Sequence, residues 1–392
     1  MFSVSPTFNV YFASMQGGPQ LVHLSPEAAV KSIGQFPRQL RHAVHGAADA
    51  VGIGAAIAHS RWRRRRLLIL CYHGVSLDDE HLWSNLYVSP AHLARRVAGL
   101  RRANASVLPL DEALQRLQHD DLPPQSVTVT FDDGAYDFSA RAVPILEAAS
   151  MHATLYLTTW YCGRPLPVFD TMASYLLWKG RGRVLRIPEF ESTVRIGAAT
   201  TEPDFQALHQ KIRSLAEMGA YTADEKHAYL ERLATAIGVD FASIMERRML
   251  QLMTPQEVSL LNQDLVAIEL HTHRHRTSRI REVFLHELKE NQAQISTFTG
   301  DARLRRHFCY PSGDFIPEYA HWLKDAGVES ATTCNPGLAS GADDPYFLPR
   351  IIDTEQMRPT TFRAWVSGAA HFTSRSVLPR KLHRRHGLDA RH

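Results

Sequence analysis

Two neighbouring aspartates at the end of an apolar run are the residues of this sequence best placed to do chemistry. The run Ser-Val-Thr-Val-Thr-Phe-Asp-Asp-Gly places Asp132 and Asp133 directly after five β-prone residues. It predicts a buried strand that delivers both carboxylates to its carboxyl end, where α/β enzymes keep their reactive groups. Adjacent strand residues point in different directions, so one carboxylate can bind a metal while the other transfers protons. A solvated turn is the alternative, because Asp and Gly are common turn residues.

A histidine cluster at the end of a second apolar run supplies further ligands. Residues 265–275 read Leu-Val-Ala-Ile-Glu-Leu-His-Thr-His-Arg-His. His271 and His275, with one carboxylate, form a set that binds Zn²⁺ or a similar divalent ion and leaves a position open for water. A fortuitous surface cluster is the alternative, but the preceding strand pattern and the two aspartates favour a metal site.

These two runs resemble the first and second motifs of the polysaccharide deacetylases, the NodB-homology family also called carbohydrate esterase family four. Thr-Phe-Asp-Asp-Gly matches the first motif and His-Thr-His-Arg-His the second, at every defining position. The resemblance implies that Asp132 is the catalytic base and that Asp133, His271 and His275 bind the metal. It also implies an α/β fold, a distorted (β/α) barrel of the NodB type. His273 falls at a free position of the motif, so we expect it beside the ligands or facing solvent.

Shorter likenesses extend the resemblance over residues 67–368. Leu-Leu-Ile-Leu-Cys-Tyr-His-Gly-Val, at residues 67–75, resembles the opening strand of members whose motifs are circularly permuted. In those members an early Tyr-His histidine takes the place of the general acid found elsewhere near the C-terminus. His73 is therefore the candidate acid, with a structural histidine at a strand end as the alternative.

The third motif of the family is matched only in part. His-Phe-Cys-Tyr-Pro-Ser-Gly stands where many members have Arg-x-Pro-Tyr, so the arginine that orients the base is missing. A backbone amide near Tyr310 and Ser312 can still stabilise an oxyanion, because an amide N–H does not depend on its side chain. Arg350, which ends another apolar segment, is the candidate for the positive charge beside Asp132. A surface salt bridge is the alternative.

The distribution of motifs favours one barrel domain with additions at both ends. With 392 residues and 44% apolar content, the chain can bury a full barrel core. We expect a partly disordered leader with a basic segment over residues 1–66, the barrel over 67–368 and a basic tail over 369–392. Residues 161–252 carry no family motif and show helical apolar spacing, which predicts a helical insertion beside the substrate cleft. Aromatic residues in this stretch or directly before it stack on sugar rings or belong to a core: Trp160, Tyr161, Phe169 and Trp178.

The expected reaction is removal of an N-acetyl group from an amino sugar in a polysaccharide or glycan precursor, with release of acetate. A divalent ion, best matched by Zn²⁺, would polarise the amide and acidify water. Asp132 would accept the proton of that water, and His73 would protonate the departing amine. Two alternatives stay open: hydrolysis of another non-peptide C–N amide on the same barrel, and an inactive sugar-binding barrel with a damaged third motif.

Charge and targeting patterns bear on partners and location. The net charge is only +4, but arginines cluster at residues 61–66 and in the tail. For residues 61–66 an anionic membrane fits better than nucleic acid, for which no binding signature is present; a solvated linker is the alternative. A lipid-linked glycan precursor at the inner face of the membrane would then be a substrate. We find neither a signal peptide nor metal-knuckle spacing among the four cysteines, and so expect a cytoplasmic protein with reduced thiols.

Overall fold

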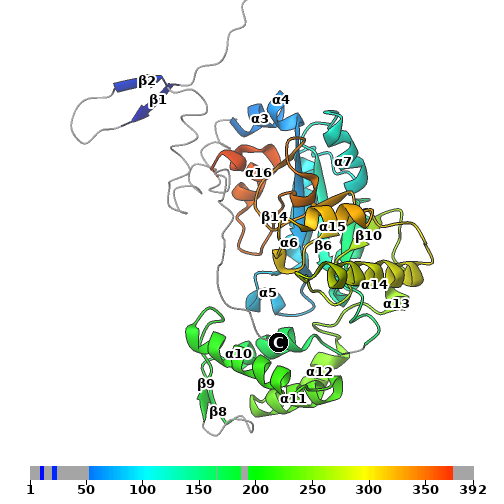
Figure 1. Ribbon diagram of the computed structural model, residues 1–392. Coiled ribbons are helices and arrows are strands. Elements are labelled where there is room, and N and C mark those ends of the chain that lie inside the picture. Colours follow the sequence, from blue (N-terminus) through cyan, green and yellow to red (C-terminus); the bar gives the residue numbers. More distant parts are fainter. Residues whose placement is uncertain (1–8, 13–19, 24–52, 165, 187–192, 374–392) are drawn as a thin grey trace, which may run out of the picture.

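The computed structural model of the protein (Figure 1) describes residues 9–12, 20–23, 53–164, 166–186 and 193–373. Most of the expected leader, and the basic tail from residue 374, lie outside the described residues. Two short strands near the start, β1 (Asn9–Phe12) and β2 (Gln20–His23), pair antiparallel. Across the described ranges, no helix has the length and apolar character that a membrane span requires.

A curled, mostly parallel sheet forms the centre of the molecule. Its long strands are β3 (Arg66–Tyr72), β6 (Val127–Asp133), β7 (Ala153–Leu157) and β10 (Val266–Leu270), which neighbour one another in that order. They are buried almost throughout, as expected of parallel strands that are covered on both faces. The remaining strands of the sheet are shorter: β11 (His307–Cys309), β12 (Ser330–Thr332), β13 (Ala339–Ser340) and β14 (Ile351–Ile352).

Hydrogen bonds close this sheet into a barrel. β14 pairs in parallel with β3, and Leu348, just before β14, forms a parallel bridge with Thr332 of β12 at the opposite edge. The Leu348 amide donates to the Ala331 carbonyl at 2.9 Å, and the Thr333 amide donates to the Leu348 carbonyl at 2.9 Å. The sheet therefore returns on itself, and the predicted distorted (β/α) barrel is confirmed.

Helices between the strands cover the outer face of the barrel. They are α6 (Pro90–Arg102), α7 (Leu110–Gln118), α8 (Val143–Ala148), α14 (Arg281–Thr299), α15 (Tyr319–Asp325) and α16 (Pro359–Ser367). Leu68 and Leu70 of β3 pack with Leu93 and Val97 of α6 in the main core. Because side chains alternate along a strand, Cys71, which follows Leu70, points to the other side, towards the barrel interior and Asp132.

A helical cluster interrupts the barrel between β7 and β10. It consists of α9 (Phe169–Lys179), the hairpin β8 (Val184–Leu185) and β9 (Val194–Arg195), α10 (Pro203–Met218), α11 (Ala223–Ala236) and α12 (Phe241–Glu246). Tyr175, Phe205 and Leu233 belong to its own apolar core, which is separate from that of the barrel. In Figure 1 the cluster lies below the mouth of the barrel. The predicted helical insertion is thus present, and its exact limits stay a prediction.

Part of the basic segment at residues 61–66 is buried and forms hydrogen bonds within the protein. Arg63 lies in α4 (Arg61–Arg64) and is fully buried, and its guanidinium donates to the backbone carbonyls of Ser126 and Val366 at 3.1 Å each. Arg65 pairs with Asp120 at 2.8 Å. A buried guanidinium cannot reach lipid headgroups. The predicted membrane contact therefore applies only to those arginines of the segment that are exposed.

Candidate active site

The carboxyl ends of the barrel strands open into a cleft of about 580 Å³. Its lining includes five of the residues predicted from the sequence: His73, Asp132, Asp133, His275 and Ser312. They come from the ends of β3 and β6 and from the loops after β10 and β11. Parallel strands end at the same edge of a sheet, which brings these distant parts of the chain together.

Asp133, His271 and His275 form a compact group of three ligands. Oδ1 of Asp133 lies 3.1 Å from Nε2 of His271 and 3.1 Å from Nε2 of His275. The three potential ligand atoms lie within 4.8 Å of one another. Nδ1 of His271 donates to the Cys309 carbonyl at 2.8 Å, which leaves Nε2 as the lone-pair nitrogen that a metal ligand needs. One carboxylate and two imidazoles with converging atoms fit Zn²⁺ or a related divalent ion.

An unusual backbone conformation directs these ligands. Asp133, Thr272 and His275 have φ angles of 75°, 61° and 56°, in the left-handed region that residues other than glycine seldom adopt. Gly134 follows with φ 88°, and a Cβ there would lie 2.2 Å from Cδ1 of Leu157 on β7. The glycine of the first motif is therefore required by the close approach of two strands. Strained residues held by surrounding structure are common where a site must be preorganised.

A buried amide on α14 connects the metal ligands to β7. Oδ1 of Asn291 accepts the backbone N–H of His271 at 2.9 Å, and its Nδ2 donates to the Leu157 carbonyl at 2.9 Å and to Oγ1 of Thr159 at 3.0 Å. The same Thr159 Oγ1 lies 2.8 Å from Nδ1 of His273, which is buried. His273 thus lies beside the ligand group and not within it.

Asp132 and Arg350 form a buried, bidentate ion pair inside the barrel. Nη1 and Nη2 of Arg350 donate to Oδ1 and Oδ2 of Asp132 at 2.8 Å each, and Nε donates to the Thr333 carbonyl at 3.1 Å. Burial opposes ionisation of Asp132, but the charge and hydrogen bonds of Arg350 hold the pKa of this carboxyl below its usual value. Burial likewise opposes the charge on Arg350, yet Asp132 raises the pKa of the guanidinium. Arg350 therefore stands beside the predicted base and not at the surface.

His73 approaches the same carboxylate from β3. Its Nε2 lies 3.7 Å from Oδ2 of Asp132, and the side chain is 16% exposed at the floor of the cleft. The loop that carries it is held by Asp137, a buried residue that the sequence reasoning missed, whose carboxylate accepts the Val75 N–H at 2.8 Å. Burial raises the pKa of Asp137 well above its usual value. Its position within the same segment as the aspartate pair was the available signal.

Two buried thiols also adjoin the predicted base and were not predicted as site residues. Sγ of Cys309 lies 3.4 Å and Sγ of Cys71 lies 3.6 Å from Oδ2 of Asp132. Burial raises the pKa of both thiols well above the usual value, so they stay neutral. Cys71, His73 and Asp132 also have ligand atoms close enough to share a metal. Arg350 already occupies both oxygens of Asp132 with its positive charge, which disfavours a second cation there.

The two residues predicted near the oxyanion lie in different surroundings. Tyr310 is buried, its phenol donates to the Tyr346 carbonyl at 2.9 Å, and its amide donates to the Thr332 carbonyl at 3.3 Å. Neither group of Tyr310 can therefore reach a substrate. Ser312 lines the cleft with φ 56°, and within the described part of the chain its backbone N–H has no hydrogen-bond acceptor. Only Ser312 of this pair can present an amide to an oxyanion.

Sequence comparison matches residues 119–189 to one protein family, described as polysaccharide deacetylase. The matched segment contains Asp132 and Asp133. The family resemblance is confirmed. Together with the site geometry, the matched segment resembles the polysaccharide deacetylases, which are hydrolases of the class that cleaves C–N bonds other than peptide bonds. Comparison with curated proteins finds no match.

Several solved structures of similar proteins align with most of the chain. The Streptococcus pyogenes deacetylase PplD, in complex with acetate, is 18% identical with a TM-score of 0.49, covering 75% of this chain and 95% of that one. IcaB from Ammonifex degensii is 16% identical with a TM-score of 0.46, covering 79% and 98%. A de-N-acetylase from Aggregatibacter actinomycetemcomitans is 16% identical with a TM-score of 0.45, covering 75% and 98%.

The aromatic residues near the site of this deacetylase-like protein divide into two groups. Trp178 belongs to the core of the insertion, and the Trp160 ring is covered by the guanidinium groups of Arg164 at 4.4 Å and Arg274 at 4.7 Å. Both indoles therefore already contact other side chains of the protein. Tyr161 and Phe169 line cavities at the site, and the Trp160 side chain also lines the one beside the insertion.

Proposed function

We propose that the protein removes an N-acetyl group from an amino sugar within a glycan and releases acetate, with a divalent ion, best matched by Zn²⁺, held by Asp133, His271 and His275. The single observation that carries the proposal is the convergence of these three ligands beside Asp132 at the mouth of the barrel. The match of residues 119–189 to the deacetylase family supports the same reaction.

The roles of the remaining residues follow from their positions around the cleft. A divalent ion bound by the three ligands would polarise the acetamide carbonyl and bring the pKa of a water towards about 7. Asp132 accepts the proton of the attacking water, while Arg350 fixes both oxygens of this carboxylate. The Ser312 amide donates to the oxyanion of the tetrahedral intermediate. His73 donates a proton to the departing amine as the C–N bond breaks, which yields acetate and a free amino sugar.

An inactive sugar-binding barrel is less well supported. That alternative rested on the arginine missing from the third motif. Arg350 now supplies a guanidinium at 2.8 Å from the base, delivered from the segment that closes the barrel. Hydrolysis of another non-peptide amide would use the same groups, so only the choice of substrate separates it from de-N-acetylation.

The test is purification with metal analysis, followed by an acetate-release screen over N-acetylated glycans. We expect Asp132→Asn to keep the metal and lose turnover by about 100-fold or more, because only the proton acceptor is changed. His271→Ala is expected to lose both metal and turnover. His119→Ala, at an exposed histidine directly after α7, is the control and should match the wild type. Full activity of Asp132→Asn would overturn the assignment of the base, and turnover of small amides alone would favour the other hydrolase.

We further propose a cytoplasmic location with peripheral contact to anionic membrane and a lipid-linked glycan precursor as substrate. The membrane contact is supported by the exposed Arg61 and Arg64, which lie beside the apolar α3 (Ile53–Ala58). In a flotation assay with anionic liposomes, Arg61→Gln/Arg64→Gln should float less than the wild type. Equal flotation of the two proteins would remove this proposal.

A further inference from the structure

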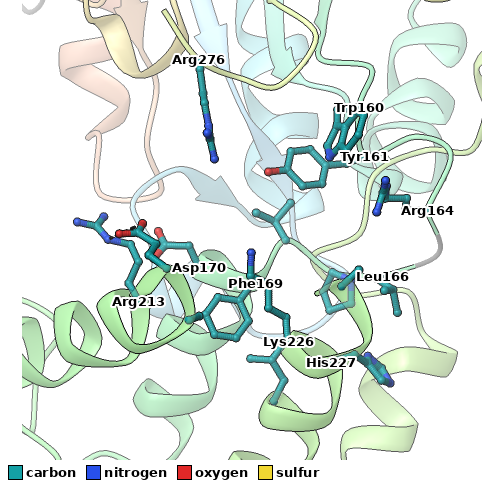
Figure 2. Close-up of a pocket in the computed structure, with 16 residues that line it drawn as sticks. Trp160, Tyr161, Arg164, Leu166, Phe169, Asp170, Arg213, Lys226, His227 and Arg276 are labelled. Atoms are coloured by element: carbon teal, nitrogen blue, oxygen red, sulfur yellow. Dashed lines mark ion pairs between the residues drawn. The ribbon is translucent and has the colours of Figure 1, made fainter. Parts of the chain in front are cut away.

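A second cavity, of about 360 Å³, lies beside the catalytic cleft, between the barrel and the helices of the insertion. Figure 2 shows that its lining comes from both sides, with Arg276 from the barrel and Lys226 from α11. The cavity and the cleft share Tyr161, Val168 and Arg276 among their lining residues. A glycan whose N-acetylated sugar lies at Asp132 can therefore continue into the second cavity.

Three cations line this cavity without a counter-charge of their own. Arg164, Lys226 and Arg276 form no ion pair with any residue that the structure describes. Arg164 lies over the Trp160 ring at 4.4 Å, and Lys226 lies 6.0 Å from the centre of the Phe169 ring. These aromatic contacts hold the cations beside the cavity but leave their charges unneutralised.

Each of the two carboxylates of the cavity has a basic side chain close to it. Oδ1 of Asp170 lies 3.1 Å from Nε2 of His209, and Oε1 of Glu217 lies 3.9 Å from Nε of Arg213. The lining as a whole therefore carries an excess of positive charge. A cavity whose lining carries an excess of one sign of charge concentrates ligands of the opposite sign.

The remaining wall of the cavity is apolar. Leu166, Pro167, Phe169 and Leu230 form it, mainly on the side of the insertion. Such a wall suits the apolar face of a sugar ring, whereas a small free anion would gain nothing from it. The combination of a sugar-sized apolar surface with unpaired cations indicates a charged sugar unit.

We propose that the second cavity binds a negatively charged unit of the glycan, a carboxylate or phosphate group adjacent to the N-acetylated sugar. The inference rests on the proposed function, because it assumes that the sugar being deacetylated lies in the first cleft. Guanidinium and ammonium groups recognise both kinds of oxyanion through charge-assisted hydrogen bonds. The insertion thereby selects for substrate charge, while the barrel carries out the hydrolysis.

The experiment compares acetate release from three probes. Chitotetraose, used in its fully N-acetylated form, is neutral; a hyaluronan tetrasaccharide carries carboxylates next to N-acetylglucosamine, and UDP-N-acetylglucosamine carries phosphates. We expect kcat/KM to be higher for one of the two anionic probes than for chitotetraose, and the better of the two identifies the anion. The preference should fall as salt is raised, because the cations are near the surface.

Variants then assign the preference to this cavity. Arg164→Gln/Lys226→Gln should reduce the ratio of anionic to neutral kcat/KM by about tenfold, at roughly threefold for each partly exposed contact. Arg102→Gln/Lys289→Gln removes the same charge from exposed positions outside the cavity and should leave the ratio unchanged. Arg276 is kept because it adjoins the ligand His275.

Failure of the anionic site and failure of the proposed deacetylation would give different results. Equal kcat/KM on neutral and anionic probes, or the same ratio in both double variants, overturns the anionic site and leaves the deacetylase proposal standing. No acetate from any probe, with metal bound, counts against the proposed function. In that case calorimetric binding of the anionic probes decides the inference, which is overturned if wild type and Arg164→Gln/Lys226→Gln bind them equally.

Discussion

Replacing Arg350 by methionine tests how strongly the buried ion pair stabilises the site. Methionine keeps the aliphatic part of the side chain and removes the guanidinium with its charge and its donors. The side chains of Arg350 and Asp132 are 0% and 2% exposed, and their closest N–O distance is 2.8 Å. The substitution would therefore leave the Asp132 carboxylate buried without its counter-charge.

The magnitude follows from this burial. Two unit charges about 4 Å apart attract by about 4 kcal/mol at an effective dielectric constant of about 20. Removing one partner of a buried pair costs about 3–5 kcal/mol in other proteins, whereas an exposed pair contributes about 1 kcal/mol at most. We expect Arg350→Met to lower the free energy of unfolding by about 4 kcal/mol.

The assay is urea unfolding followed by circular dichroism at pH 7, with a chelator present so that metal binding does not contribute. A double-mutant cycle adds Asp132→Asn. The double variant should be more stable than the sum of the single effects predicts, because an amide needs no counter-charge. Arg102→Met, at an exposed helix position, is the control. Additive effects of the two site substitutions, or a loss below about 1 kcal/mol for Arg350→Met, would refute the reasoning.

Three further substitutions test the surroundings of the site. Asn291→Ala should lower the free energy of unfolding by roughly 3 kcal/mol in urea titrations, because buried partners including the His271 amide lose hydrogen bonds. Gly134→Ala should lower both stability and acetate release, and Leu157→Ala should cost less stability in that background than in the wild type, because an added Cβ at Gly134 would lie 2.2 Å from Leu157 Cδ1. Burial opposes ionisation of Asp353, but hydrogen bonds from His92 and Arg96 lower its pKa, so its stabilising effect is present above the unfolded-state pKa of about 3.9 and is lost as pH falls below it. Asp353→Asn should therefore be less stable than wild type by about 3 kcal/mol at pH 7, with a difference that begins to shrink only below about pH 4 in thermal or urea unfolding.

The elements of the barrel were predictable because their signals are local. The apolar runs before Asp132 and His271 predicted β6 and β10, and the helical spacing at residues 90–100 and 111–117 predicted α6 and α7. The residues of each motif are neighbours in the sequence. They therefore lie close together at the end of one strand whatever the tertiary structure. Closure of the sheet through Leu348 was not visible, because that bridge joins segments with no common pattern.

The sequence by itself determined which groups could act as base and metal ligands, since residue type and spacing along one strand end decide that. Only the tertiary structure decided their neighbours: Arg350 against Asp132, the thiols of Cys71 and Cys309 beside the same carboxylate, and the phenol of Tyr310 turned into the core. The physical reason is that burial and charge pairing depend on how strands far apart in the chain come into register. Composition and periodicity describe one segment at a time, whereas the dielectric surroundings of a carboxylate are set by all the segments that enclose it.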